Sequence, residues 1–428
     1  MIEYIKYWLR KKTFSDIGVV LVENVLSKGF HFLLIILISR TLGPEKYGVY
    51  SFVTVSVLFL ALFFDFGMEN VAVRFVGKHP DKQKEIFGIY FLFKTIMLVI
   101  LFFLILLFPS LVVALVNKPE IEKYLSIIFI GCVVENYQYV IAAYFSSREK
   151  FLFRAFVNTG VYFLRLVSVF ILLRLSVFDL RVISFIFVVS GIPFVLLFSR
   201  HFFTFLRAFF TNKVSRILFR SILHYAKWIT VGSVAWTIMT RLDFYIVTSY
   251  LSFREVGLYN AAVQLLVLFG IVQIACQKVF LPKVAKYKDL SQMKNYIRKS
   301  VKLLMGISIC IFLVMPFTRF MILFSFGREY LEISVVLRIL LISFLFTLWN
   351  IMLGHVFYSL GYAKYMTIGV YIELVVFIIS ALSFIPRFGM EGAALSRMIG
   401  KGCYLLFVVY FLHRLVYLRK PLSNLEQA

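Results

Sequence analysis

Long apolar stretches, separated by short polar and charged segments, run through nearly the whole chain. A helix needs about 20 mostly apolar residues to cross the ~30 Å hydrocarbon core of a bilayer. Twelve stretches reach that length, in two sets of six, at residues 15–39, 46–76, 86–109, 121–145, 152–173 and 181–199, and then at 225–249, 256–280, 299–323, 331–359, 364–386 and 389–413. The pattern predicts an all-α membrane protein with about twelve transmembrane helices.

A short segment between the first two apolar stretches has a similar copy 209 residues later, between the seventh and eighth stretches. Leu42, Gly48 and Tyr50 of RTLGPEKYGVY, which starts at Arg40, correspond to Leu251, Gly257 and Tyr259 of YLSFREVGLYN, which starts at Tyr250. Each set of six spans brings the chain back to the same side, so the two sets enter the membrane in the same direction, as parallel repeats do. We therefore predict an N-terminal lobe at 1–205, a basic cytoplasmic connector at 206–224 and a C-terminal lobe at 225–428.

Composition and charge support this class and fix an orientation. The 428 residues are 61% hydrophobic and 18% aromatic, with a net charge of +25. Of the 46 Lys and Arg residues, the twelve-span topology places 29 on the side that holds both termini, 10 on the opposite side and 7 within spans. Basic residues favour the cytoplasmic side. The bias therefore predicts cytoplasmic termini in a cytoplasmic (inner) membrane, and it explains the charge without nucleic-acid binding. The four isolated cysteines indicate packing and no metal site.

Several motifs spread over the chain resemble the polysaccharide flippases of the multidrug, oligosaccharidyl-lipid and polysaccharide exporter superfamily, the type that handles O-antigen and capsule units. They are SRTLGPEKYGVYSF from Ser39, DFGMENVAVRFV from Asp65, RLDFYIVTSYLSFREVGLYNAA from Arg241, LGYAK from Leu360 and IPRFGMEGAALSR from Ile385. The resemblance implies a bacterial or archaeal membrane protein with a V-shaped pair of six-helix bundles. These bundles would open alternately around a cationic cavity, and the substrate would be an oligosaccharide on a polyprenyl diphosphate. Many relatives carry Asn where this chain has Ser380 and Ser383, which weakens any transfer of their cation site.

Thirteen charged residues lie inside the predicted spans, away from the span ends. A charge at a helix centre costs about 2.5–3.5 kcal/mol on insertion scales, so each should face protein or water. The cations are Lys28, Lys94, Arg165, Arg241, Arg338, Arg397 and Lys401, and the acids are Glu23, Asp65, Glu69, Glu135, Asp243 and Glu373. Because the two signs nearly balance, structural pairing is the first expectation. We expect such pairs between Arg165 and Glu135 and between Glu373 and Lys401.

The first span carries a polar stripe. At about 100° per residue, its members occupy less than half of the helix circumference: Glu23, Asn24, Ser27, Lys28 and His31. Such a stripe at mid-depth favours a helix that lines the substrate cavity, and the alternative is a structural contact inside the bundle. The resemblance to the flippase family implies that the first helix of each lobe lines the cavity.

The second span is marked by two acids one turn apart, Asp65 and Glu69, with Gly67 between them. Like charges at this spacing repel each other unless they are hydrated, protonated or bridged. A glycine beside polar residues predicts a bend, which lipid tolerates only where neighbours or cavity water satisfy the freed backbone groups. We interpret these three residues as a bend with a gating role.

Five further charged residues are candidates for substrate binding or ion coupling, and each also has a structural alternative. Arg241 in the seventh span suits a diphosphate, since guanidinium binds phosphate oxygens bidentately, or else a salt bridge. Asp243 is a candidate for coupling to Na⁺ or H⁺, as is Glu373. Arg397 and Lys401 share a helix face and form a possible second cationic patch for the substrate.

Absent motifs narrow the function. The sequence has no GxxxxGK[ST] phosphate loop, no HExxH and no sizeable soluble domain, so we expect a transporter without cofactors and not an enzyme. The primary hypothesis is a flippase for lipid-linked oligosaccharides, in contact with membrane lipids and with glycan polymerase and chain-length proteins as possible partners. The alternatives are a drug antiporter of the same fold, a membrane glycan polymerase or ligase, for which the outer loops are short, and a scaffold without transport.

Overall fold

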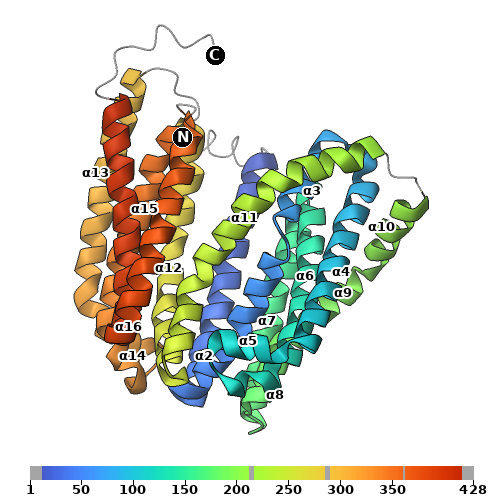
Figure 1. Ribbon diagram of the computed structural model, residues 1–428, viewed down its shortest axis with the longest axis horizontal. Coiled ribbons are helices and arrows are strands. Elements are labelled where there is room, and N and C mark those ends of the chain that lie inside the picture. Colours follow the sequence, from blue (N-terminus) through green and yellow to red (C-terminus); the bar gives the residue numbers. More distant parts are fainter. Residues whose placement is uncertain (1–11, 212–215, 285–289, 360–361, 417–428) are drawn as a thin grey trace. The chain divides into compact units, whose positions relative to one another are not determined.

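The computed structural model describes residues 12–211, 216–284, 290–359 and 362–416, and every regular element within them is a helix (Figure 1). The all-α membrane class is therefore confirmed. Nine described segments are long and apolar enough to cross a membrane. Two of them, Gly18–Phe63 and Lys364–Leu415, are each long enough for two crossings. The total of twelve transmembrane helices stays a prediction. The orientation of the two termini also stays a prediction, because both termini lie outside the described residues.

Contacts divide the chain into two compact units, Met1–Tyr245 and Ile246–Ala428. The boundary falls inside helix α11 (Arg216–Tyr250), most of which packs with the first unit. Compact units record packing and not duplication, so the lobe limits at residues 205 and 225 remain a prediction. Residues 212–215 of the predicted connector lie outside the described residues.

The first unit contains the helices that cover the first seven predicted spans, together with one helix, Ser199–Thr211, that lies between the sixth and seventh spans. They are α2 (Lys12–Phe63), α3 (Met68–Lys78), α4 (Gln83–Leu107), α6 (Leu125–Ser147), α7 (Phe151–Arg174), α8 (Leu180–Val189), α9 (Ile192–Leu197), α10 (Ser199–Thr211) and α11; shorter elements are η1 (Pro80–Lys82), α5 (Pro109–Val116) and η2 (Pro119–Tyr124). The sixth span is not one helix, because α8 and α9 are separated at Ser190–Gly191.

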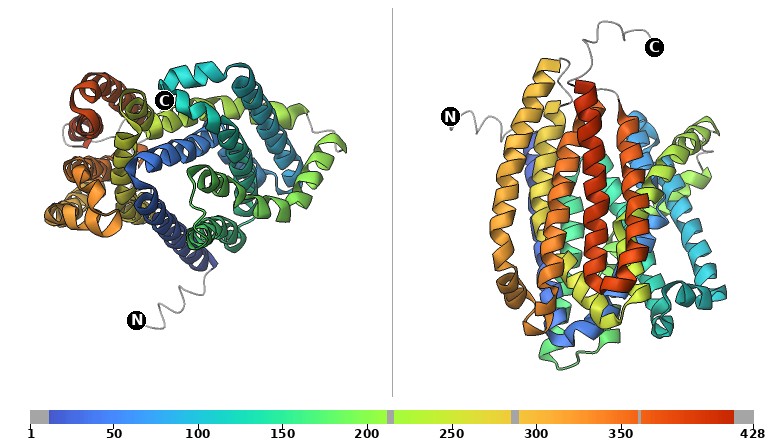
Figure 2. Two further views of the ribbon diagram at one scale, coloured as in Figure 1. Left: turned by 90° about the horizontal axis from the view of Figure 1, so that it is seen from below. Right: turned by 60° about the vertical axis from the view of Figure 1, so that its left-hand side comes forward.

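The second unit contains the remaining spans. Its elements are α12 (Phe253–Val284), α13 (Leu290–Val314), η3 (Met315–Phe317), α14 (Thr318–Ser325), η4 (Arg328–Ile333), α15 (Ser334–Ser359) and α16 (Ala363–Val416). Helices α13 and α16 both pack against α15 (Figure 2). α16 covers two predicted spans and is interrupted at Gly389, whose φ of 56° lies in the left-handed region.

Both copies of the repeated segment end one helical stretch and begin another. In the first copy, α2 bends at Gly43, which has φ 73° and ψ 170° and precedes Pro44. Proline lacks the N–H that a helix needs, so it starts the new stretch readily. In the second copy, α11 ends at Tyr250, and the backbone N–H and hydroxyl of Ser252 both donate to Glu255 Oε2 at 3.0 and 2.8 Å, which caps the start of α12.

Aromatic side chains form much of the core of the first unit. Phe87 of α4 packs edge-on against Tyr144 of α6, with ring centroids 5.3 Å apart, and stacks on Phe205 of α10 at 5.4 Å. Lipid is as apolar as these side chains, so close van der Waals packing and buried polar contacts are what hold membrane helices together. Large apolar residues elsewhere are exposed, among them Leu152, Phe210 and Leu406, as expected for faces that meet acyl chains.

Candidate functional site: a charged cavity in the first unit

All five residues of the polar stripe on α2 line one cavity inside the first unit. The cavity has a volume of about 280 Å³. Its other walls come from the second half of α2 and from α6 and α7, through Leu58, Glu135, Gln138, Tyr139, Arg154, Asn158, Val161, Tyr162 and Arg165. This volume lies near the lower end of the range for small-ligand pockets, and it suits one sugar-sized group or several waters.

One corner of the cavity is built around Glu23, which is 5% exposed. Asn158 Nδ2 donates to Glu23 Oε1 at 2.6 Å, and Arg154 Nε lies 3.7 Å from the same oxygen. Glu23 Oε2 has no hydrogen-bond partner among the described residues. A buried carboxylate oxygen without a partner costs free energy, so this corner suits a donor from outside the protein, either a ligand hydroxyl or water.

A second corner is closed by the expected ion pair between Arg165 and Glu135. Arg165 Nη2 lies 2.5 Å from Glu135 Oε1, and its Nε donates to Phe187 O at 3.0 Å and to Ser190 Oγ at 3.2 Å. Both charged side chains are buried. This guanidinium is thus neutralised by a buried carboxylate and held by further hydrogen bonds through Nε, which supports a structural role.

Lys28 differs from Arg165, because no carboxylate lies within 4 Å of its ammonium group in the described part of the chain. The residue is half-buried and lines the cavity. His31, one turn along, packs edge-on against Tyr162 at 5.3 Å, and its Nδ1 has no partner among the described residues. Lys28 and His31 therefore offer polar groups that the described protein leaves unused.

Neither of the two candidates on α11 lines this cavity, and one of them, Arg241, lies near it. Arg241 is half-buried and within electrostatic range of His31 and Tyr162. Asp243 is buried and engaged in contacts of its own. The structure thus brings Arg241 toward the predicted stripe.

The bend predicted in the second span is present, and its acid is bridged. α2 ends at Phe63 and α3 begins at Met68, with Gly67 at φ 74°. Lys94 Nζ lies 2.6 Å from Asp65 Oδ1, and Tyr90 donates to that oxygen at 2.9 Å. The backbone N–H of Glu69 donates to Asp65 Oδ2 at 3.2 Å.

The candidates in the second unit are partly paired. Lys401 Nζ lies 3.1 Å from Glu373 Oε1, as expected for a structural pair. Arg397 has contacts of its own. Ser380 and Ser383 both donate back to carbonyls of their own helix, at 2.7 and 2.9 Å. Because Lys401 is paired with Glu373, less positive charge is left for the predicted second cationic patch. The hydroxyls of the two serines are hydrogen-bonded to the helix backbone without a bound ion.

Sequence reasoning misses the opposite wall of the cavity. The charge count places Arg154 with the cytoplasmic loop residues, and nothing in the pattern singles out Asn158, Gln138 or Tyr139. Arg154, Asn158 and Arg165 recur at intervals of four and seven, which puts them on one face of α7. That spacing is the available signal, and only the fold shows that this face meets α2.

An all-helical, multi-pass bundle with a charged cavity among its helices is the architecture of a membrane transporter. The chain belongs to the polysaccharide biosynthesis protein family, whose model matches residues 14–288. It is 22% identical over 383 residues to a Shigella flexneri protein named as a putative O-antigen transporter, covering 84% of this chain and 88% of the relative. It is 24% identical over 404 residues to the capsular polysaccharide biosynthesis protein CapF of Staphylococcus aureus, covering 92% and 98%.

Two solved structures share the fold at low identity. The lipid II flippase MurJ in an inward closed conformation gives a TM-score of 0.75 at 15% identity, covering 93% of this chain and 87% of that one. An inward-facing multidrug resistance MATE family transporter of the MOP superfamily gives 0.71 at 15% identity, covering 91% and 94%. These likenesses confirm the expected transporter fold.

Proposed function

We propose that this protein is a flippase that moves polyprenyl-diphosphate-linked oligosaccharides from the inner to the outer leaflet of the cytoplasmic membrane. The observation that carries the proposal is the polar cavity between α2, α6 and α7, in which Lys28 lacks a protein counter-ion among the described residues. Family membership and the names of the relatives support a surface-glycan cargo. Lys28, with Arg241 nearby, would offset the charge of the diphosphate, while Glu23 and Asn158 would accept and donate hydrogen bonds to sugar hydroxyls.

The mechanism that follows is alternating access between two lobes, with the polyprenyl chain remaining in lipid. Asp243 and Glu373 stay the two candidates for coupling to Na⁺ or H⁺, although Lys401 engages Glu373 and Asp243 has contacts of its own. Cytoplasmic termini, the role of Gly67 as a gating bend, and glycan polymerase and chain-length proteins as partners belong to the same proposal.

The test is complementation of a flippase-deficient strain with the variant Lys28→Ala/Arg241→Ala. A hydrogen bond to a charged group contributes about 1.5–3 kcal/mol, so we expect glycan export to fall by about tenfold or more, with lipid-linked intermediates accumulating inside. Arg298→Ala/Lys299→Ala, which removes two exposed cations from α13, is the matched control. Wild-type export by the first variant at equal expression would refute the assignment.

A drug antiporter of the same fold is the second candidate, since a MATE transporter shares the fold. The cavity lining counts three cations, Lys28, Arg154 and Arg165, against the two acids Glu23 and Glu135, which disfavours an organic cation as cargo. Increased resistance to organic cations on expression, with unchanged glycan output, would support this candidate instead.

A further inference from the structure

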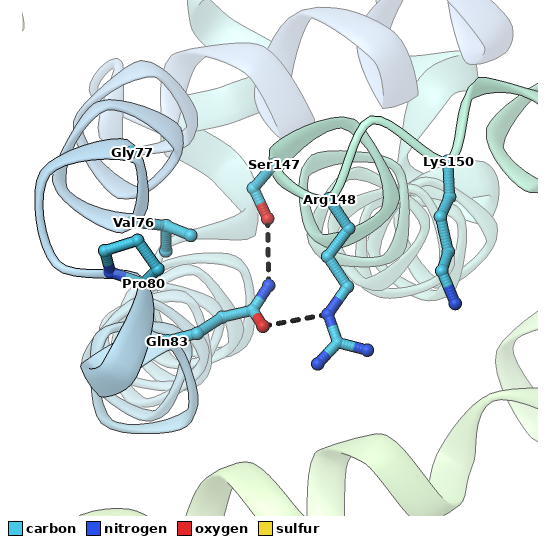
Figure 3. Close-up of a pocket in the computed structure, with 7 residues that line it drawn as sticks. All are labelled: Val76, Gly77, Pro80, Gln83, Ser147, Arg148 and Lys150. Carbon is cyan, nitrogen blue, oxygen red and sulfur yellow. Dashed lines mark hydrogen bonds between the residues drawn. The ribbon is translucent and has the colours of Figure 1, made fainter.

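A second pocket lies at the ends of the helices, separate from the charged cavity. It measures about 370 Å³ and is lined by Val76, Gly77, Pro80, Gln83, Ser147, Arg148 and Lys150 (Figure 3). The turn that joins α3 to α4 forms one side, and the turn that joins α6 to α7 forms the other. The distribution of basic residues assigns this end to the cytoplasm.

Neutral groups hold the guanidinium of Arg148 in place. Its Nε donates to Gln83 Oε1 at 2.8 Å, Gln83 Nε2 donates to Ser147 Oγ at 3.2 Å, and Ser147 Oγ donates to Tyr144 O at 2.8 Å. The guanidinium also lies 4.9 Å from the centre of the Tyr144 ring. The two Nη atoms point away from Gln83 (Figure 3). Arg148 is thus pre-oriented while both of its terminal nitrogens stay available.

The positive charge of this pocket has no ion-pair partner in the described part of the protein. In the described ranges, no carboxylate lies within 4 Å of the side-chain nitrogens of Arg148 or Lys150, in contrast to the paired Arg165 and Lys94. The nearby His201 responds to this charge. Burial lowers the pKa of His201, and the positive fields of Arg148 and Lys150 lower it further. Two fixed cations in a pocket of this kind suit the phosphate of an anionic ligand.

Exposed apolar side chains begin immediately beside the pocket. Leu152, Phe153 and Phe156, in the first turns of α7, are 70, 52 and 57% exposed, and Lys150 Nζ lies 5.8 Å from the centre of the Phe153 ring. Acyl chains attached to a bound phosphate would run along these side chains. A soluble phosphate would leave them unused, so the arrangement favours a lipid as the source of the anion.

We propose that this pocket binds the headgroup of an anionic phospholipid of the phosphatidylglycerol type. The phosphate contacts the Nη atoms of Arg148 and the ammonium of Lys150, and the acyl chains lie on the apolar start of α7. Basic pockets between transmembrane helices on the cytoplasmic side are a known setting for such headgroups. The proposal does not depend on what the protein transports.

The experiment titrates the full-length protein, purified in detergent, with dioleoyl phosphatidylglycerol and counts bound lipid by native mass spectrometry. From the usual contribution of a basic residue to anionic-lipid binding, Arg148→Gln/Lys150→Gln should weaken the tightest site about 30-fold. Arg298→Gln/Lys299→Gln removes the same two charge types from exposed positions on α13 and should change the affinity less than threefold. Lys150→Gln alone, which leaves the contact between Arg148 and Gln83 intact, is the variant to use if the double variant is poorly folded, and it should weaken the site about fivefold.

Three competitors identify the source of the phosphate. Dioleoyl phosphatidylcholine and glycerol 1-phosphate should both fail to displace phosphatidylglycerol. Equal losses of phosphatidylglycerol affinity in the two double variants would mean that the lipid is attracted by the overall positive charge of the protein and is not bound at this pocket. Displacement by glycerol 1-phosphate would indicate a soluble anion, and preferential displacement by a polyprenyl phosphate would indicate a substrate entry site. Each of these results would overturn the proposal.

Discussion

Replacing Gly67 by alanine is expected to destabilise the protein by about 2–5 kcal/mol. Gly67 has φ 74°, where an L-residue with a Cβ loses about 1–2 kcal/mol. A Cβ there would also lie 2.3 Å from Ser233 Oγ and 2.6 Å from Ile229 Cγ2 of α11, and overpacking of this kind costs about 1–3 kcal/mol more. The measurement is the thermal melting midpoint in detergent, together with the yield of monodisperse protein.

Two further variants separate the causes. Gly77→Ala is the matched control, because a Cβ at Gly77 meets nothing within 4 Å, and it should leave the melting midpoint unchanged. Gly67→Ala combined with Ser233→Gly should recover the part of the loss that comes from the contact with Ser233, and retain the conformational part and the contact with Ile229. If Gly67→Ala melts like the wild type, the left-handed bend does not exist in solution.

Replacing Lys94 by methionine should be about as damaging. Lys94 is fully buried and lies 2.6 Å from both Asp65 Oδ1 and Asn136 Oδ1. Removing one partner of a buried ion pair leaves an uncompensated charge and costs about 3–5 kcal/mol. Lys84→Met, an exposed lysine on the same helix, should cost little. The melting midpoint of Lys94→Met should fall by about 5 °C, because a chain of 428 residues has a large entropy of unfolding.

The second substitution in this series is Asp65→Asn on the Lys94→Met background. It removes the stranded charge, while the amide oxygen of the new side chain can still accept the hydrogen bond from Tyr90, which Asp65 accepts at 2.9 Å. Stability should therefore rise relative to Lys94→Met alone. A double variant less stable than the single one would mean that Asp65 is not the charge that Lys94 neutralises.

The hydropathy pattern is sufficient for the fold class, because lipid requires every spanning segment to be long, apolar and internally hydrogen-bonded. It fails at the sixth span, for which it predicts one helix. The backbone of Gly191 approaches Gln138 so closely that a Cβ would lie 1.8 Å from Gln138 Nε2, and Pro193 follows in the first turn of α9. The Gly-Ile-Pro sequence is visible in the chain, but the close approach that requires glycine is not.

For the candidate site, one wall is predictable from the sequence and the other is not. The stripe from Glu23 to His31 follows from helical periodicity within one segment. Its partners Arg154 and Asn158 lie more than 120 residues away, and nothing local specifies which helix faces which. The same reasoning explains why the sequence leaves a bridged Asp65 as one of three alternatives and does not identify Lys94, on the following span, as its partner.

Helix α11 has a consequence for engineering. Thr230 donates to Phe66 O at 3.0 Å, Tyr245 donates to Ser56 Oγ at 3.2 Å, and Arg74 lies over the ring of Tyr225 at 4.2 Å. Its side chains are therefore fitted to the helices that precede it. Chimeras that exchange halves between relatives should be spliced at the elbow around Leu251–Ser252. A junction within 206–224 would graft a foreign seventh helix onto a surface shaped for the native one.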